Sequence, residues 1–385
     1  MNIDNEIYIG TRAAAFDNED TLWISDFKYG GLYRYHLGKR DLHSIHYFGN
    51  TEVMESQLHE EMIFRDDKLY MISNDDKYLM RIYDIPNKEE SIPVWAKNRQ
   101  GYYGCRISTD KMVFFIKENG CTIIDYYIND NREDYNENAS ERIRNYLNYK
   151  YDDARFFLSK NWIIIWLSNR KKLIRLDPSY NIVDSFCLGE LKNDIYKIYY
   201  EGGEYWIMFM NQHNILSCDQ NGRTIIDYTI DDPNLIESQK RYEAVLSLPI
   251  YASMTLYNEQ AVFSNYYGNS IVVASRKIGK LERVFSEYFD YKVNPTDRLI
   301  GGCYPRIIEH NSHLYFLPCL ADRILEMDEN YDVVDSYKMR AHIDPNRHNE
   351  MLRFTLKNGL VRENDLFGLS TFVSTMCNQN EEVIV

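Results

Sequence analysis

Three arginines occupy corresponding places in a repeated sequence pattern. Arg106, Arg155 and Arg306 stand in the pairs CR, AR and PR, each near the start of a strand-like stretch. A guanidinium group carries a planar fork of N–H donors that matches the oxygens of a carboxylate or a phosphate. Arg12 and Lys197 lie one to three residues out of register with them in two further segments. We therefore predict that these five cations bind an anionic ligand.

Two residues of another segment could move protons at the same place. His59 and Glu61 lie at the corresponding level, and imidazole and carboxyl groups are common general acids and bases. They are weak candidates for catalytic residues of a lyase or hydrolase that holds its anionic substrate with the arginines. In the alternative interpretation, the arginines pair with neighbouring carboxylates such as Glu60, Asp152 and Asp153 and have a structural role. The sequence alone leaves both interpretations open.

The pattern that must position these residues is a repeat of short strands. An apolar stretch, a polar turn, an aromatic-centred strand, a second turn and an apolar strand ending near Asp follow one another, as in AFDNEDTLWISDFKYGGLYRYH at 15–36. The centres of the second strand recur at a spacing of roughly 40 to 60 residues, which is typical of four-stranded repeat units. They are Trp23, Tyr70, Phe114, Ile164, Trp206, Phe263 and Tyr315.

These repeats predict an all-β fold, a single β-propeller over residues 1–345. Seven blades of four-stranded antiparallel sheets fit best, and six blades are the alternative if 103–128 or 245–275 is not a repeat. The stretch IYIG at 7–10 is expected to complete the last blade. Helical periodicity predicts a helix within 133–147 and, in a C-terminal extension at 346–385, a short helix at about 364–377 that packs on the propeller or on a partner.

The repeats resemble the bacterial β-propeller repeat superfamily over roughly residues 10–342. The resemblance lies in AFDNEDTLWIS and RDDKLYMIS, which look like the turn-and-strand unit of kelch-like and of six- or seven-bladed lyase-type propellers. The double glycine of kelch repeats, the WD dipeptide and the SxDxGxTW box of sialidases are missing. The resemblance therefore implies the propeller fold without one particular activity.

Composition and charge exclude several classes of function. The formal charge of −14 argues against nucleic-acid binding, which requires a basic stripe, and the apolar runs are too short to span a membrane. Seven scattered cysteines, never in a CxxC, and an N-terminus without an apolar signal segment predict a cytoplasmic location. No nucleotide, dinucleotide or metal motif is present, so we predict no cofactor and no metal site. The histidines of HSIH and of HNSH are three residues apart, and residues with this spacing point to opposite faces of a strand. A joint ligand role would need a sharp turn, which only the HNSH pair could form.

Exposed aromatic residues suggest a second kind of site. Tyr29, Tyr266 and Tyr267 fall in hairpin tips after the second strand, where tyrosines either form a protein or peptide interface or pack on the adjacent blade. The sequence thus predicts a binding or scaffold propeller that recognises a protein, a peptide or a small anionic ligand at its axial mouth and hairpin-tip face. The alternative is a propeller lyase or hydrolase.

Overall fold

The computed structural model falls into two compact units, each described here by itself. Unit 1 comprises Met1–Ser73, Met80–Ser91 and Asp232–Val385, and unit 2 comprises Asn74–Leu79 and Ile92–Asp231. The structure describes residues 6–26, 30–48, 59–75, 78–99, 101–108, 110–147, 154–159, 161–189, 195–210, 214–229, 251–265, 271–275, 280–283, 306–318 and 323–342, and the single residues 304, 344 and 346.

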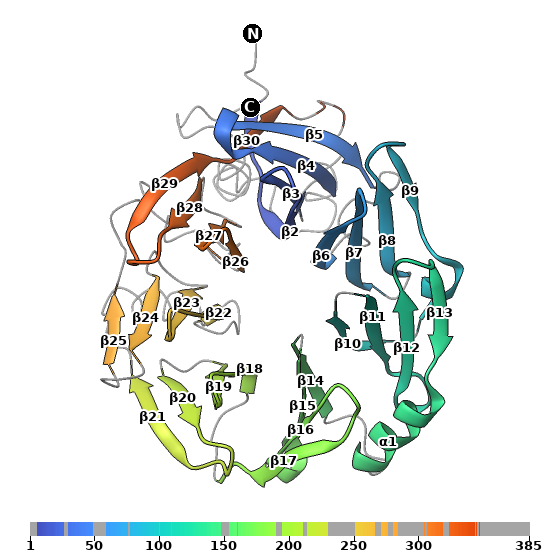
Figure 1. Ribbon diagram of the computed structural model, residues 1–385, viewed down its shortest axis with the longest axis vertical. Coiled ribbons are helices and arrows are strands. Elements are labelled where there is room, and N and C mark those ends of the chain that lie inside the picture. The colour runs from blue at the N-terminus through green and yellow to red at the C-terminus, as the bar shows by residue number, and fades with distance from the viewer. Residues whose placement is uncertain are drawn as a thin grey trace, which may run out of the picture. The chain divides into compact units, whose positions relative to one another are not determined.

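The described residues form seven four-stranded antiparallel sheets whose strands follow one another in chain order (Figure 1). This confirms the predicted β-propeller with seven blades. Both repeats on which the six-bladed alternative depended form complete sheets, β10–β13 and β22–β25. We number the blades 1 to 7 along the chain and call the first strand of each blade its innermost strand.

Unit 1 contains four of these blades, with part of β7 and β8 assigned to unit 2. Blade 1 is formed by β2 (Thr11–Phe16), β3 (Thr21–Asp26), β4 (Gly31–His36), the 3₁₀ turn η1 (Leu37–Lys39) and β5 (Asp41–Tyr47). Blade 2 is formed by β6 (His59–Arg65), β7 (Lys68–Asp75), β8 (Tyr78–Asp84) and β9 (Glu89–Ser91). Blade 6 is formed by β22 (Tyr251–Tyr257), β23 (Gln260–Asn265), β24 (Val272–Ser275) and β25 (Lys280–Arg283). Blade 7 is formed by β26 (Arg306–His310), β27 (His313–Leu317), β28 (Arg323–Met327) and β29 (Val333–Lys338).

Unit 2 contains the other three blades. Blade 3 follows η2 (Val94–Ala96) and is formed by β10 (Tyr102–Ile107), β11 (Lys111–Ile116), η3 (Glu118–Gly120), β12 (Thr122–Tyr127) and β13 (Arg132–Tyr135), and the helix α1 (Glu137–Leu147) comes next. Blade 4 is formed by β14 (Ala154–Leu158), β15 (Ile163–Leu167), η5 (Ser168–Arg170), β16 (Lys172–Leu176) and β17 (Ile182–Cys187). Blade 5 is formed by β18 (Ile195–Glu201), β19 (Glu204–Phe209), β20 (Asn214–Cys218) and β21 (Thr224–Thr229).

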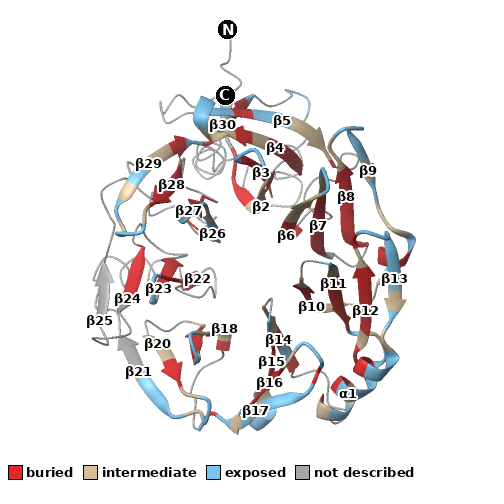
Figure 2. Ribbon diagram, viewed as in Figure 1, coloured by how far each residue is buried: buried red, intermediate tan, exposed pale blue. Residues whose placement is uncertain are grey.

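Burial explains why these sequences form strands. The second strand of a blade is covered on both faces, so β3 and β15 are buried along their whole length. The strand β15 is the continuous apolar run IIIWL, while β3, TLWISD, is apolar at its centre and buries polar residues at its ends. The fourth strand covers the blade edge, and β17 is mostly exposed, with Ile182 and Val183 open to solvent. Figure 2 shows this gradient from buried middle strands to exposed outer strands.

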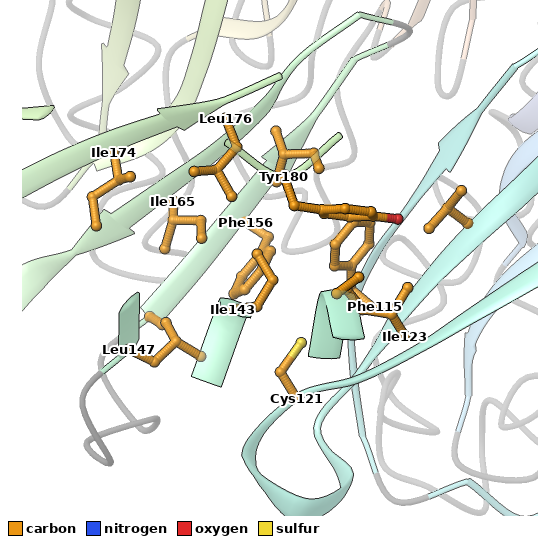
Figure 3. Packing of buried hydrophobic residues seen from close by; sticks show 14 of the residues in the cluster. Phe115, Cys121, Ile123, Ile143, Leu147, Phe156, Ile165, Ile174, Leu176 and Tyr180 are labelled. Carbon is orange, nitrogen blue, oxygen red and sulfur yellow. The ribbon is translucent and has the colours of Figure 1, made fainter. Parts of the chain in front are cut away.

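The predicted helix within 133–147 is present but starts later. Residues 132–135 instead form β13, the fourth strand of blade 3, and α1 begins after Asn136, whose side-chain oxygen accepts the backbone N–H of Ala139 at 3.1 Å. Ile143 and Leu147 are fully buried and point toward Phe156 and neighbouring side chains of blades 3 and 4 (Figure 3). The helix thus extends the apolar core between these two blades of unit 2.

The N-terminal strand pairs differently from the prediction. The first strand, β1 (Glu6–Tyr8), pairs antiparallel with β30 (Arg340–His342) in a separate two-stranded sheet, while blade 7 has four strands of its own. The two ends of the described part of unit 1 are therefore tied together outside the blade, because the last sheet already has its outer strand. The predicted C-terminal helix at 364–377 lies outside the described residues.

The aspartate that directly follows the third strand organises the hairpin to the fourth strand. In blades 4, 5 and 7 one oxygen of Asp177, Asp219 or Asp328 accepts the backbone N–H groups of the residues two and four places later, at 2.8–3.0 Å. These bonds lower the pKa of all three carboxyl groups. The residue three places later is left-handed in each turn, with φ of 65° at Tyr180, 76° at Gly222 and 66° at Tyr331.

Four third strands also bury a charged side chain, and each one is paired. Asp125 accepts from Lys111 at 2.9 Å, Arg81 binds Glu90, and Glu326 accepts the hydroxyl of Tyr315 at 3.1 Å. In blade 4, Arg175 binds Asp184 and lies 3.6 Å and 4.1 Å from the ring centres of Tyr200 and Trp162. Pairing offsets the cost of removing these charges from water.

The aspartate turns predict a loss of stability in acid. A carboxyl group with a lowered folded pKa contributes stability above its unfolded pKa and loses it as the pH falls through the folded pKa. Replacing Asp177, Asp219 and Asp328 together by alanine should lower the urea midpoint at pH 7 and flatten its decline between pH 5 and pH 3. The matched triple asparagine variant keeps an oxygen acceptor, so its midpoint at pH 7 should lie closer to that of the parent. Equal midpoints for the alanine variant and the parent would contradict the role of these turns.

The buried ion pair of blade 4 gives a second prediction. Arg175→Met leaves Asp184 without its cationic partner, with the hydroxyl of Tyr205 still donating to it, and should cost about 3–5 kcal/mol of the free energy of unfolding. The double variant Arg175→Met with Asp184→Leu removes both charges and should recover most of this loss. We expect a double-mutant cycle, measured by urea unfolding of the parent, the two single variants and the double variant, to give the coupling free energy of the pair. Additive effects of the two substitutions would show that the pair is not coupled.

Candidate functional site

A recurring irregularity marks the start of the innermost strands. In five blades the pairing of the innermost strand with the second strand shifts by one residue, and in blade 1 this shift lies between Thr11 and Ala13. A β-bulge of this kind turns a side chain away from the regular alternation and is frequent next to functional sites. In each of these five blades, the first residue after the bulge lies four places before the residue at which the innermost strand enters the hairpin turn to the second strand. We call this place the inner position.

Counting four residues back from this hairpin residue identifies the inner position in all seven blades. In blade 4 it is four places before Ser159, whose N–H bonds the carbonyl of Trp162, and in blade 7 four places before His310, which pairs with His313. The inner positions of the seven blades are Ala13, Glu61, Gly104, Arg155, Lys197, Ser253 and Arg306.

Unit 2 has only cations and a glycine at its inner positions. Arg155 is exposed on β14, and its Nη1 donates to the backbone carbonyl of Ile195 on β18 at 2.7 Å. Lys197 is two residues further along β18, half-buried, with Nζ 5.2 Å from the ring centre of Tyr199. The third inner position, Gly104 on β10, carries no side chain. The strands β14 and β18 are adjacent innermost strands (Figure 1). Arg155 and Lys197 therefore stand on neighbouring strands, and one hydrogen bond fixes the guanidinium group of Arg155.

Unit 1 repeats the same hydrogen bond with a more mixed set of neighbours. Arg306 on β26 is half-buried, and its Nε donates to the carbonyl of Arg12 on β2 at 2.8 Å. Arg12 is the bulged residue of its strand and is also half-buried. Glu61, at the inner position of β6, is exposed. An arginine at the inner position thus binds the backbone of the next innermost strand in both units.

Arg106 does not share this position, contrary to the predicted register. It lies two rather than four places before the hairpin residue Ser108 and is only 4% exposed. Its charge acts on Tyr180, whose pKa is raised by burial and by Asp125 and lowered by Arg106. Arg106 therefore belongs to the packed region between blades 3 and 4, and Lys197 takes its place in the register.

The candidate proton carrier His59 is enclosed between blades 1 and 2. Its side chain is fully buried, Nδ1 lies 2.6 Å from Oγ of Ser25, and its ring meets that of Phe48 edge-on at 5.1 Å. Burial, followed by the charge of Arg81, lowers the pKa of His59 to about 3. A neutral imidazole without solvent access does not support proton transfer to a bound ligand. A catalytic role of His59 or Glu61 stays a prediction.

A polar network surrounds the enclosed histidine. Glu90 binds Arg81 and accepts from Nε2 of His46 at 3.0 Å, while Arg81 also lies 5.5 Å from the ring centre of Phe48. Burial acts to raise the pKa of Glu90, but the hydrogen bond from His46 and the charge of Arg81 lower it. The network keeps Glu90 ionised. The carboxylate of Glu90 in turn holds the positively charged guanidinium group of Arg81 close to His59.

The described residues contain no group of three or more side chains suited to a metal ion, and none of their helices is long and apolar enough to cross a membrane. The histidines spaced three apart have separate partners. His43 lies 2.6 Å from Asp41, His310 lies 2.7 Å from Asp20, and His313 binds Glu326. The predicted interface residues Tyr29, Tyr266 and Tyr267 lie outside the described residues.

Sequence reasoning missed two features that the sequence does mark. Counting four places back from the first residue of the turns SKNW, EGGE and HNSH selects Arg155, Lys197 and Arg306 together, whereas alignment on the second strand groups Arg106, not Lys197, with the other two arginines. The buried charges of the third strands appear as a single charged letter within apolar runs, in LMRIYD, LIRLD and ILEMD. Both signals depend on position within the repeat rather than on residue type.

Comparison with known proteins shows the fold alone. No family model matches the chain, and no curated protein matches it. Among solved structures, a streptogramin B lyase is 12% identical with a TM-score of 0.52, and the match covers 82% of this chain and 92% of that one. A catalytically inactive virginiamycin B lyase from Staphylococcus aureus with quinupristin is 11% identical, with a TM-score of 0.53 and coverage of 81% and 92%.

A further similar structure belongs to another class of protein. The extracellular domain of a protein described as a hybrid two component system of B. thetaiotaomicron is 10% identical with a TM-score of 0.51, and the match covers 81% of this chain and 37% of that one. Lyases and an extracellular domain of a two component system thus share this architecture. At these identities the likeness supports the propeller fold and says nothing about activity.

The enclosed histidine predicts a steep loss of stability in mild acid. His59 stays neutral in the folded chain down to about pH 3, whereas in the unfolded chain it takes up a proton below about pH 6.5. Stability should therefore fall by about 1.4 kcal/mol for each pH unit between these values. His59→Asn removes the titration, so its free energy of unfolding should depend less steeply on pH. His43→Asn, at an exposed site, is the control, and an unchanged slope in His59→Asn would refute the assignment.

Proposed function

We propose that the protein is a non-catalytic binding propeller that holds an anionic group of its ligand at the innermost strands β14 and β18. One observation carries the proposal. Arg155 and Lys197 occupy the inner positions of adjacent strands, and Arg155 is oriented by its bond to the carbonyl of Ile195. A guanidinium group has five N–H donors, so this bond leaves others to meet a carboxylate or a phosphate.

The surroundings of this pair favour an anion. Gly104 at the next inner position leaves its place without a side chain, and a Cβ there would lie 2.6 Å from Cδ1 of Leu158. Neither Arg155 nor Lys197 forms an ion pair with another residue of the described segments of the chain. Two cations on neighbouring strands, without an ion pair among the described residues, produce a local positive potential in a chain with a formal charge of −14.

The arginine of unit 1 supports a related role. Arg306 and Arg12 form the equivalent arrangement, with the same type of bond to the next strand. We assign them the same function toward an anionic group, although Glu61 at an inner position of the same unit makes this pair a weaker candidate. The alternative of a lyase or hydrolase requires a proton carrier at the site, and the enclosed position of His59 provides little support for one.

Binding of small anions tests the proposal directly. A panel of mono- and dicarboxylates and of inorganic phosphate is titrated by isothermal calorimetry against the parent chain, Arg155→Gln and Lys197→Gln. Each substitution should weaken binding of the best anion by about tenfold, which is the loss of one charge-assisted contact. Arg132→Gln removes an equally charged, exposed side chain of the same unit and should bind like the parent. Unchanged affinity in both inner-position variants would refute the proposal.

A further inference from the structure

A row of cations continues outward from Arg155 along one edge of blade 4. Ala154, its neighbour on β14, pairs with Leu167 at the end of β15, and Leu167 pairs with Lys172 at the start of β16. These three strand ends therefore share one edge of the sheet. With a strand spacing of about 4.8 Å, β16 lies about 10 Å from β14.

The turn between β15 and β16 adds two more charges. Arg170 ends the short η5 turn and Lys171 follows it, and both side chains are exposed. Lys171 has a left-handed backbone with φ of 48°, and its N–H bonds the carbonyl of Ser168 at 3.1 Å. The backbone of this turn has a defined conformation, and it places Arg170 and Lys171 next to Lys172.

A sixth cation reaches this edge from blade 3. Lys117 is exposed, and its Nζ lies 5.2 Å from the ring centre of Tyr103. Tyr103 stacks on Phe156 with ring centres 4.4 Å apart, and Phe156 directly follows Arg155. Lys117 is thus linked through one stacked pair of rings to the strand that carries Arg155.

These cations differ from the others of unit 2 in their lack of ion pairs. Arg99, Lys111, Arg132, Arg144 and Arg175 each bind a carboxylate. Within the described residues, no ion pair involves any member of the group that we call the basic face, which consists of Lys117, Arg155, Arg170, Lys171, Lys172 and Lys197. Its charge is therefore available to a partner.

We infer that the basic face is a docking surface for an acidic, extended segment of a partner protein. The inference rests on the proposed function, because one carboxylate of the segment is held by Arg155 and Lys197. A small anion contacts only Arg155 and Lys197. The cations at the turn between β15 and β16 lie about one electrostatic screening length from this pair at physiological salt, so they contribute little to binding of the small anion. Alternate residues of an extended chain are about 7 Å apart. Acidic side chains at alternate positions of a bound segment can therefore reach both the inner pair, Arg155 and Lys197, and the cations of the turn between β15 and β16.

The overall charge favours an acidic peptide over a nucleic acid. Unit 2 presents this face within a chain of formal charge −14, which repels a long polyanion beyond the face itself. A short segment with a few carboxylates gains the local attraction without meeting the acidic remainder of the surface. Recognition by a cation row should also give binding that weakens as salt concentration rises.

The test compares a short acidic peptide with a small anion. A fluorescein-labelled peptide of ten residues with alternating glutamate and serine is titrated by fluorescence anisotropy, and the best small anion by calorimetry. The triple variant Arg170→Gln, Lys171→Gln, Lys172→Gln should bind the peptide about tenfold more weakly and the small anion like the parent. The matched control Lys39→Gln, Lys88→Gln, Lys338→Gln removes three exposed cations of unit 1 and should leave both affinities unchanged.

The outcomes separate this inference from the proposed function. Equal peptide binding by the triple variant and the parent overturns the docking surface, even if Arg155→Gln still weakens the small anion. Loss of peptide binding in the triple variant, with Arg155→Gln unchanged for both ligands, overturns the anion site and leaves the outer cations as the docking surface. Tighter binding of a ten-nucleotide single-stranded DNA than of the peptide overturns the assignment to a protein partner. Circular dichroism spectra like that of the parent show that each variant is folded.

Discussion

The innermost strand of each blade has one edge without a hydrogen-bonded neighbour in its own sheet, and this edge constrains the whole site. Unpaired backbone groups need partners when they leave water. In the described segments the partners come from adjacent blades. Arg155 and Arg306 donate to carbonyl groups of the next innermost strand, and the N–H of Thr11 donates to the carbonyl of Pro318 at 2.7 Å. The bulge at the start of these strands turns the backbone groups toward such partners.

Because the free edge needs hydrogen-bond partners, the two interpretations that the sequence leaves open for the arginines, a structural role and a ligand-binding role, are compatible. A structural role accounts for one N–H donor of Arg155, and the planar guanidinium group keeps its other donors in fixed directions. The bond to Ile195 thus orients the group, and it would lower the entropy lost on binding of the anion that we propose. Lys197 has no such bond to the backbone among the described residues and contributes charge more than geometry.

The sequence predicts the architecture well because the signals for it are local. Apolar second strands, turn residues and repeat spacing lead directly to seven four-stranded blades, and Trp23 and Trp206 are buried at strand centres as expected. The site is less predictable because its register depends on the bulge, which has no fixed sequence signature. Arg106 lies after the bulge of β10 and only two places before Ser108, so the position of the hairpin turn, which the pair CR does not mark, separates it from Arg155 and Arg306. The enclosure of His59 depends on contacts with Ser25 and Phe48 of another blade, which no local pattern reveals.

The distribution of charge separates structural groups from groups that are available to ligands. Inside the blades, charges such as Arg175 and Glu326 are paired with carboxylates, histidine or tyrosine hydroxyls, because an unpaired charge in a packed interior is costly. Such pairs are neutralised and attract little from outside. Along the edge of blade 4, the cations of the basic face form no ion pair with another described residue. Lys117, Arg155, Arg170 and Lys171 are exposed, and an unpaired charge costs little where it stays in contact with water. A ligand of the proposed docking surface would have to displace this water and offset the positive charge, and for this reason we propose an acidic partner even though the contacts of individual exposed side chains are weak.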